Sequence, residues 1–248
     1  IAYELAAKGA NVIGIPKSID NDIQATDQTF GFDTAVTTAT EALDKLHTTA
    51  ESHHRVMVLE LMGRYTGWIA LYSGLAGGAD VILIPELPWK PEGVADKVIR
   101  RRTEGKPFSI VVVAEGTPTP EGKLITREII PESRETLRLG GIGNVVGRII
   151  EEKTGIETRV TVLGHIQRGG SPTPFDRVLA TRFGVAAAEL ALARTYGVLV
   201  CLQGGKITPT SLTREAVKTR PVPPDSQLLQ VARELNIYIG ESETSKRQ

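Results

Sequence analysis

Residues 55–64 read RVMVLELMGR, an apolar run that ends in a glycine and a cation. The run is continuous rather than alternating, which is typical of a strand buried on both faces of a parallel sheet. Similar runs that are rich in β-branched residues occupy residues 11–15, 80–84, 108–114 and 158–163. The repetition of this pattern predicts a sheet built mostly from parallel strands.

Segments with helical spacing of their apolar residues separate these runs. They span residues 32–47, 68–76, 94–102, 144–153 and 176–194, and a last one spans 226–235. Alternation of strand and helix predicts an α/β fold with a mostly parallel sheet. The first eight residues resemble the end of a helix that Gly9 terminates, so we expect this chain to be a piece of a longer protein.

Composition excludes several classes of protein. The 248 residues are 41% hydrophobic, and 29 basic residues balance 29 acidic ones. A zero net charge predicts no bulk attraction to nucleic acid or to a membrane surface, and no apolar stretch is long enough to span a bilayer. The single cysteine, Cys201, fits a reducing, cytoplasmic compartment and is predicted to be a small core residue.

Residues able to bind anions follow the predicted strands. Met-Gly-Arg at 62–64, Pro-Glu at 85–86, Glu-Gly at 115–116 and Gly-His-Ile-Gln-Arg-Gly-Gly at 164–170 each come directly after an apolar run. In parallel sheets, ligands bind beyond the carboxyl ends of the strands. Cations, carboxylates and glycines at that edge predict an anion-binding crevice.

The side chains in these positions leave two interpretations open. An arginine offers a planar fork that matches phosphate oxygens, although most arginines are ordinary surface charges. His165 could bind a phosphate oxygen or be a structural histidine, and Glu115 could bind sugar hydroxyls or lie in solvent. Four arginines lie at strand ends: Arg55, Arg64, Arg159 and Arg168.

A loop at residues 14–22, GIPKSIDND, carries one cation, one hydroxyl and two carboxylates. Pro16 ends the preceding strand because it has no N–H to donate. In an extended segment, Asp20 and Asp22 would point the same way into one cleft, where they would need a cation or metal nearby. The alternative is a solvated turn in which the Asp and Asn side chains bind their own backbone.

Several familiar signatures are missing. There is no G-x-x-x-x-G-K-[ST] loop and no G-x-G-x-x-G after a strand, which argues against a nicotinamide-dependent dehydrogenase. His53 and His54 have no third ligand at suitable spacing, so a zinc site is not expected. Glu60, inside the apolar run, is predicted to be a partly buried structural acid.

Taken together, the motifs resemble those of the 6-phosphofructokinases. They are PKSIDND at 16–22, SHHR at 52–55, MGR at 62–64, AEG at 114–116 and TRVTVLGHIQRGGSP at 158–172. The resemblance implies transfer of a phosphoryl group from ATP to the 1-hydroxyl of fructose 6-phosphate, giving fructose 1,6-bisphosphate in glycolysis. Its alternatives are pyrophosphate as the donor, or sugar-phosphate binding without turnover in this piece.

The same resemblance implies roles for individual residues. Asp20 would be the general base, Lys17 and Arg64 would assist the transfer, and Asp22 would position Mg²⁺. Arg55 and Arg159 would reach the site of a neighbouring subunit, which implies a homo-oligomer, usually a tetramer. The residues expected to bind the sugar phosphate are Ser18, Asp20, Arg55, Met62, Gly63, Arg64, Glu115, Arg159, His165 and Arg168.

The resemblance also implies two three-layer α/β/α sandwich domains. Residues 1–31 with 167–217 would form the remainder of a donor-side domain, and residues 32–166 with 218–248 a sugar-phosphate-side domain. The family's N-terminal, glycine-rich donor loops are absent from this sequence. Lys17 occurs both in pyrophosphate-dependent members and in one ATP-dependent branch. His47 stands where the family's effector site has a basic residue, and residues 116–133 resemble an insertion.

Overall fold

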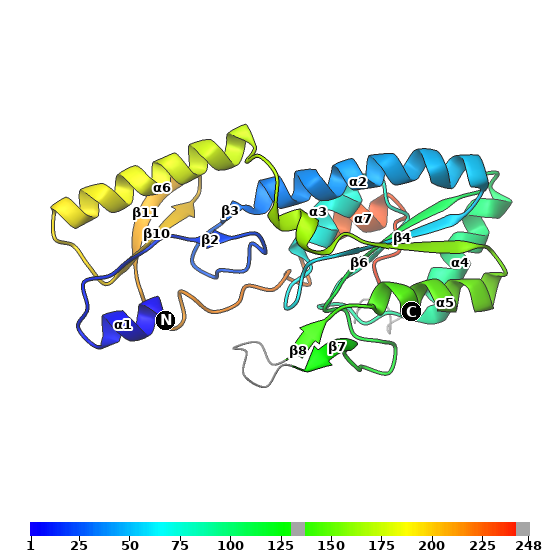
Figure 1. Ribbon diagram of the computed structural model, residues 1–248, viewed down its shortest axis with the longest axis horizontal. Helices are drawn as coiled ribbons and strands as arrows, with labels where there is room; N and C mark the ends of the chain where they lie inside the picture. Colours follow the sequence, from blue (N-terminus) through cyan, green and yellow to red (C-terminus); the bar gives the residue numbers. More distant parts are fainter. Residues whose placement is uncertain (130–136, 242–248) are drawn as a thin grey trace. The chain divides into compact units, whose positions relative to one another are not determined.

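Four parallel strands in the order β5-β6-β4-β9 form the central sheet of the larger of two units in this computed structural model (Figure 1). Strand β4 lies in the middle and pairs with β6 on one side and with β9 on the other. Every residue of β4, β5 and β6 is buried, as the continuous apolar runs predicted. The strands are β4 (Val56–Leu61), β5 (Val81–Leu83), β6 (Ser109–Ala114) and β9 (Thr158–Val162).

Helices cover both faces of this sheet (Figure 1). Helices α4 (Pro91–Thr103) and α5 (Ile142–Thr154) pack on the face that carries Val58 and Val113, where they form one hydrophobic cluster. Helices α2 (Phe32–His53) and α3 (Trp68–Ala76) lie on the opposite face. The unit is therefore a three-layer α/β/α sandwich.

The larger unit is completed by segments at its edges. The 3₁₀ helix η1 (Gly164–Arg168) follows β9, and the strands β7 (Thr126–Ile129) and β8 (Leu137–Leu139) form an antiparallel pair. Helix α7 (Gln227–Glu234) leads into Tyr238, which bridges in parallel to Val81 and so covers the free edge of β5.

The smaller unit is also layered. Its sheet has the order β1-β10-β11, with β1 (Ile13–Gly14) parallel to β10 (Val198–Gln203) and β11 (Lys206–Ser211) antiparallel to it. Helix α6 (Pro174–Leu192) packs on one face through Phe183, and α1 (Ala2–Ala7) packs on the face that carries Cys201. Two short parallel strands also pair in this unit: β2 (Lys17–Ser18) lies within the 14–22 loop, and β3 (Phe30–Gly31) follows that loop.

The structure describes residues 1–129 and 137–241. It divides into one unit of Ile1–Ala35 with Gly170–Arg220 and another of Val36–Gly169 with Pro221–Gln248. Residues 130–133 of the predicted insertion and residues 242–248 of the predicted second domain lie outside the described residues. Within the described ranges, no helix has both the length and the apolar character that crossing a bilayer requires.

The predicted α/β class with mostly parallel strands is confirmed, whereas some boundaries were wrong. Helix α2 continues to His53 rather than ending at 47, and the left-handed His54, with φ of 54°, stops it. The strand expected at 11–15 shortens to Ile13–Gly14. Strand β11 was not predicted, because its alternating polar residues carry no buried run.

Candidate functional site

In the larger unit, the carboxyl ends of adjacent parallel strands bring most of the predicted ligand residues to one edge. Met62, Gly63 and Arg64 follow β4, Glu115 follows β6, and η1 follows β9. The two basic side chains of η1, His165 and Arg168, are exposed. The structure thus gathers the residues for which the strand-end pattern predicted an anion-binding crevice: Met62, Gly63, Arg64, Glu115, His165 and Arg168.

Hydrogen bonds fasten these loops to one another. The Glu115 N–H donates to the Leu61 carbonyl at 2.8 Å, and the Gly116 N–H donates to the Gly63 carbonyl at 3.0 Å. The buried side chain of Gln167 accepts from the Met62 N–H at 2.6 Å. Backbone contacts of this kind fix the loops before any ligand arrives, which favours tight binding.

Two glycines allow the loops after β4 and β6 to touch. A Cβ on Gly116 would lie 2.0 Å from the Arg64 carbonyl oxygen, closer than any real contact allows. Gly63 has φ of 148°, and a Cβ there would lie 2.8 Å from the Thr66 carbonyl oxygen. The backbone around Arg64 therefore requires glycine at both positions.

A partly buried carboxylate without a predicted role, that of Glu86, connects segments at the same edge. Glu86, after β5, accepts from the Gly67 N–H at 3.0 Å, at the N-terminus of α3, and from the Val222 N–H at 2.9 Å. Burial raises the pKa of Glu86, against the lowering effect of the Val222 and Gly67 N–H groups. Its position directly after an apolar run was the only signal in the sequence.

Glu60 is more deeply buried than predicted, with 1% of its surface exposed. Its carboxylate accepts from the Gly141 N–H at 2.9 Å and from the Gly143 N–H at 2.7 Å. These donors belong to the first turn of α5, where unpaired N–H groups and the helix dipole favour a negative charge. Glu60 is therefore a structural acid that attaches α5 to the C-terminal part of β4.

Arg55 and Arg159 lie at the other edge of the sheet, where β4 and β9 begin. The Arg55 Nε contacts a carboxylate oxygen of Glu157 at 2.7 Å, and Arg159 pairs with the other oxygen of the same carboxylate. Six residues of strand span about 20 Å. Within one chain, these two arginines therefore do not join Arg64, His165 and Arg168.

In the smaller unit, the 14–22 loop is a turn rather than an extended segment. The Ser18 hydroxyl donates to Asp22 Oδ1 at 3.0 Å, and its oxygen accepts from the Asp20 N–H at 3.1 Å. Buried Asn21 lies between the two acids with φ of 53° and accepts from the Thr29 N–H at 3.0 Å. The alternation expected for an extended strand therefore does not apply between Asp20 and Asp22, because Asn21 reverses the chain.

His47 forms a hydrogen bond within the larger unit. Its Nε2 lies 2.6 Å from the Gly77 carbonyl oxygen, so the ring donates at this nitrogen. Nearby, Asp80 forms an ion pair with Arg101 at 2.8 Å and accepts from the Ile110 N–H. Burial raises the Asp80 pKa, while the Ile110 N–H and then Arg101 lower it.

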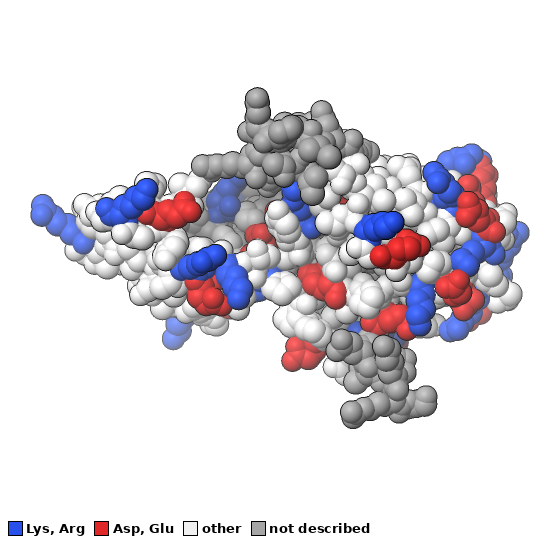
Figure 2. Space-filling model, turned by 90° about the horizontal axis from the view of Figure 1, so that it is seen from below, with Lys and Arg blue, Asp and Glu red and all other residues white. Residues whose placement is uncertain are grey.

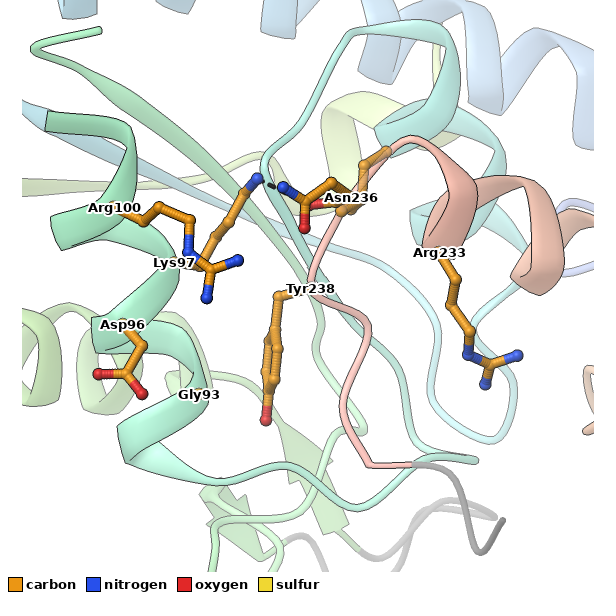
Figure 3. A pocket seen from close by; sticks show the side chains of 8 residues that line it. Gly93, Asp96, Lys97, Arg100, Arg233, Asn236 and Tyr238 are labelled. Carbon is orange, nitrogen blue, oxygen red and sulfur yellow. Dashed lines mark hydrogen bonds between the residues drawn. The ribbon is translucent and has the colours of Figure 1, made fainter. Parts of the chain in front are cut away.

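A separate surface pocket of about 270 Å³ lies between α4 and the segment after α7 (Figure 3). The Tyr238 ring fits against Gly93, where a Cβ would lie 2.4 Å from the ring. The Lys97 ammonium donates to the Asn236 carbonyl oxygen at 2.6 Å. None of the predicted site residues lines this pocket.

On the face drawn in Figure 2, basic and acidic side chains are interspersed over the described surface. In the part of the chain that the structure describes, no three His, Cys, Asp or Glu side chains form a group that could hold a metal ion. Cys201 is buried, and burial raises the pKa of its thiol.

Comparisons with known proteins agree with these motifs. The model of the Phosphofructokinase family matches residues 1–191. The chain is 55% identical over 241 residues to an ATP-dependent 6-phosphofructokinase of Chloroflexus aurantiacus, covering 97% of this chain and 66% of that protein. It is 49% identical over 225 residues to a pyrophosphate--fructose 6-phosphate 1-phosphotransferase of Amycolatopsis methanolica, covering 91% of this chain and 66% of that protein.

A solved structure gives the same result. Phosphofructokinase from Saccharomyces cerevisiae superimposes with a TM-score of 0.71 at 34% identity, covering 82% of this chain and 26% of that one. The chain spans just under two thirds of the length of the curated relatives above. With a family match over 191 of its 248 residues, this chain belongs to the phosphofructokinase family.

Proposed function

We propose that the complete protein is a 6-phosphofructokinase, which transfers a phosphoryl group to the 1-hydroxyl of fructose 6-phosphate. The observation that carries this proposal is one edge of the larger unit, where Arg64, Glu115, His165 and Arg168 all follow the carboxyl ends of neighbouring parallel strands. Guanidinium and imidazole groups suit a phosphate, and a carboxylate suits sugar hydroxyls. The ligand would thus be a phosphorylated sugar.

In this proposal, each cluster of the larger unit has a role. His165 and Arg168 bind the 6-phosphate, Met62, Gly63 and Glu115 hold the sugar, and Arg64 neutralises charge on the transferred group. Phosphoryl transfer depends on positioning and charge neutralisation more than on covalent chemistry. The backbone hydrogen bonds between these loops support that requirement.

The 14–22 loop of the smaller unit supplies the remaining groups in this proposal. Asp20 takes the proton from the 1-hydroxyl, Ser18 lines the acceptor site, and Lys17 contacts the donor's terminal phosphate. The turn that Asn21 and Ser18 maintain around Asp20 supports this role, because a general base must be held in place to accept a proton.

Mg²⁺ fits this loop as a metal bound mainly by substrate. Mg²⁺ in kinases is held by one or two carboxylates together with phosphate oxygens and water. Asp22, whose Oδ1 already accepts from Ser18, would be the protein ligand. When bound, the ion would neutralise negative charge on the phosphates.

Arg55 and Arg159 enter this proposal as residues that serve a neighbouring subunit. Their location at the sheet edge opposite Arg64 is compatible with this role. The proposed enzyme is accordingly a homo-oligomer, such as a tetramer. We place the enzyme in the cytoplasm, in glycolysis. No nucleic acid or membrane partner belongs to the proposal, which the balance of 29 basic and 29 acidic residues supports.

ATP is proposed as the donor, and pyrophosphate is the second candidate. Relatives named for either donor are 49–55% identical to this chain, and Lys17 is compatible with both. A coupled assay of the full-length protein with fructose 6-phosphate, run in parallel with ATP and with pyrophosphate, tests the proposal. Turnover with ATP alone is expected. Turnover with pyrophosphate alone would show that pyrophosphate, not ATP, is the donor. Turnover with neither would refute the proposed function.

A further inference from the structure

Gln167 differs from its neighbours in η1. His165 and Arg168 are exposed, whereas Gln167 is turned inward and only 1% of its surface is accessible. Its side chain therefore does not reach a ligand in solvent. What it contacts is the backbone of the loop after β4.

The contact extends the pairing of two strands beyond their ends. The ladder between β4 and β9 ends at Glu60 and Val162, and the Leu163 N–H still donates to the Glu60 carbonyl at 3.0 Å. The next donor along β4 is the Met62 N–H, and Gln167 Oε1 accepts from it at 2.6 Å. A side chain of η1 thus continues the hydrogen bonding where the backbone of β9 turns away.

The amide nitrogen of Gln167, Nε2, adds no hydrogen bond to any described residue that would stabilise the fold. Because Oε1 must face an N–H donor, Nε2 points elsewhere, and this buried nitrogen has no hydrogen-bond partner among the described residues. A buried donor without a partner destabilises the folded state, because it has lost its hydrogen bonds to water. Keeping glutamine here despite this cost indicates a task other than stability.

We propose that Gln167 is a positioning residue that fixes η1 against residues 62–64, so that His165 and Arg168 present their charges to the ligand that Arg64 binds. This inference rests on the proposed function of the site. Gln167 acts through the Met62 N–H and touches no substrate. Its loss should therefore affect sugar-phosphate binding first, because η1 and residues 62–64 would no longer be held in a fixed position relative to each other.

The first test compares full-length wild type with Gln167→Met, which keeps the length of the side chain but removes the acceptor. We expect a roughly 10- to 100-fold rise in KM for fructose 6-phosphate, since small displacements of binding groups have effects of this size. The donor KM should stay unchanged and kcat should change by less than about threefold. A KM for the sugar phosphate within about twofold of wild type would overturn the inference.

A conservative variant adds a readout that a merely structural role would not move. Gln167→Glu restores an oxygen at Oε1, but burial should raise the pKa of the new carboxyl and favour its neutral form. The ratio of variant to wild-type KM should therefore fall as the pH is lowered from about 8 to about 6. A ratio that does not change with pH would count against the inference.

Two controls separate the possible failures. Ser73→Ala removes a different buried polar group of this unit, the Ser73 hydroxyl, which donates to the Ile69 carbonyl oxygen at 2.6 Å. This variant should lower the melting temperature without changing the KM for fructose 6-phosphate. Hydrogen exchange of the Met62 amide and of 165–168 reports on the positioning without any activity. If wild type phosphorylates no sugar, the proposed function fails, but faster exchange in Gln167→Met still supports the positioning role. Unchanged exchange overturns it.

Discussion

The carboxylate of Glu157 binds the guanidinium of Arg55, with Nε and Oε2 2.7 Å apart, at the edge of the sheet opposite Arg64. The same carboxylate pairs with Arg159. Hydrogen bonding from Arg55, followed by the charge of Arg159, lowers the pKa of Glu157, so the carboxylate stays ionised as the pH falls toward its usual range. Both arginines proposed to serve a neighbouring subunit are thus neutralised in part by an acid of their own chain.

Glu157→Gln should therefore strengthen sugar-phosphate binding in the full-length oligomer. An exposed ion pair is worth little, so we expect the KM for fructose 6-phosphate to fall about two- to fivefold, and more at low salt. Steady-state kinetics at two ionic strengths measure this change. Glu92→Gln is the matched control, because Glu92 pairs with Lys153 on the surface of the same unit. A raised KM in Glu157→Gln would contradict the competition between Glu157 and the ligand.

Asp20→Asn should reduce turnover while leaving substrate binding almost intact. Loss of a general base lowers kcat by roughly 10²- to 10⁴-fold. The turn should survive, because the Ser18 hydroxyl contacts the Asp20 N–H rather than its carboxylate. Asp27→Asn in the same unit, where the carboxylate accepts only from the Gly204 N–H in the contacts described here, should keep kcat. Equal kcat values for both variants would remove Asp20 from the mechanism.

Gly116→Ala tests the contact between the loops after β6 and β4. A methyl group would lie 2.0 Å from the Arg64 carbonyl oxygen, so the Arg64 backbone must move. A shift of about 1 Å in a binding group can reduce kcat/KM by roughly 100-fold.

Gly184→Ala is the control for this substitution. Gly184 lies inside α6 with nothing within 4 Å of its new methyl, so alanine should stabilise the helix by up to about 1 kcal/mol. If Gly116→Ala retains wild-type kcat/KM, the two loops are not rigidly coupled.

The stability of the protein should depend on pH through Glu86. Because burial raises its pKa, the folded state binds this proton more tightly than the unfolded state does. Stability from this group is therefore greatest below the usual glutamate pKa, and it falls as the pH rises through the raised value. Glu86→Gln should flatten that fall at pH values above the usual glutamate pKa of 4.5. Urea unfolding of both proteins across this range measures the slope, and parallel curves would refute the assignment.

The sequence predicted those strands best in which every residue is buried. The run at 55–61 predicted β4 within one residue, since a short, continuous apolar run rich in β-branched residues is typical of a strand that is covered on both faces. Parallel neighbours then required Glu115, His165 and Arg168 to emerge at the same edge as Arg64. Local pattern and parallel topology together were enough for that part of the site.

What could not be predicted depends on contacts between distant segments. Nothing in the residues around Glu157 indicates that it pairs with Arg55, 102 positions earlier. The role of Gln167 could not be predicted from its position between a histidine and an arginine, because its partner is a backbone N–H, which every residue except proline carries. The sequence left a turn at residues 20–22 open as one of two alternatives, because the contact that holds Asn21 in the left-handed conformation comes from Thr29, beyond the loop.

The bridge between Tyr238 and Val81 has a further consequence for handling the protein. Tyr238 accepts from the Ile82 N–H at 2.8 Å and donates to the Asp80 carbonyl at 3.0 Å, so it seals the outermost strand of the sheet. A shortened form that ended before Ile237 would expose the unpaired backbone of Val81–Leu83 beside apolar side chains. Such a bare edge recruits strands from other molecules, and the shortened protein would aggregate at concentrations where the longer one stays dispersed.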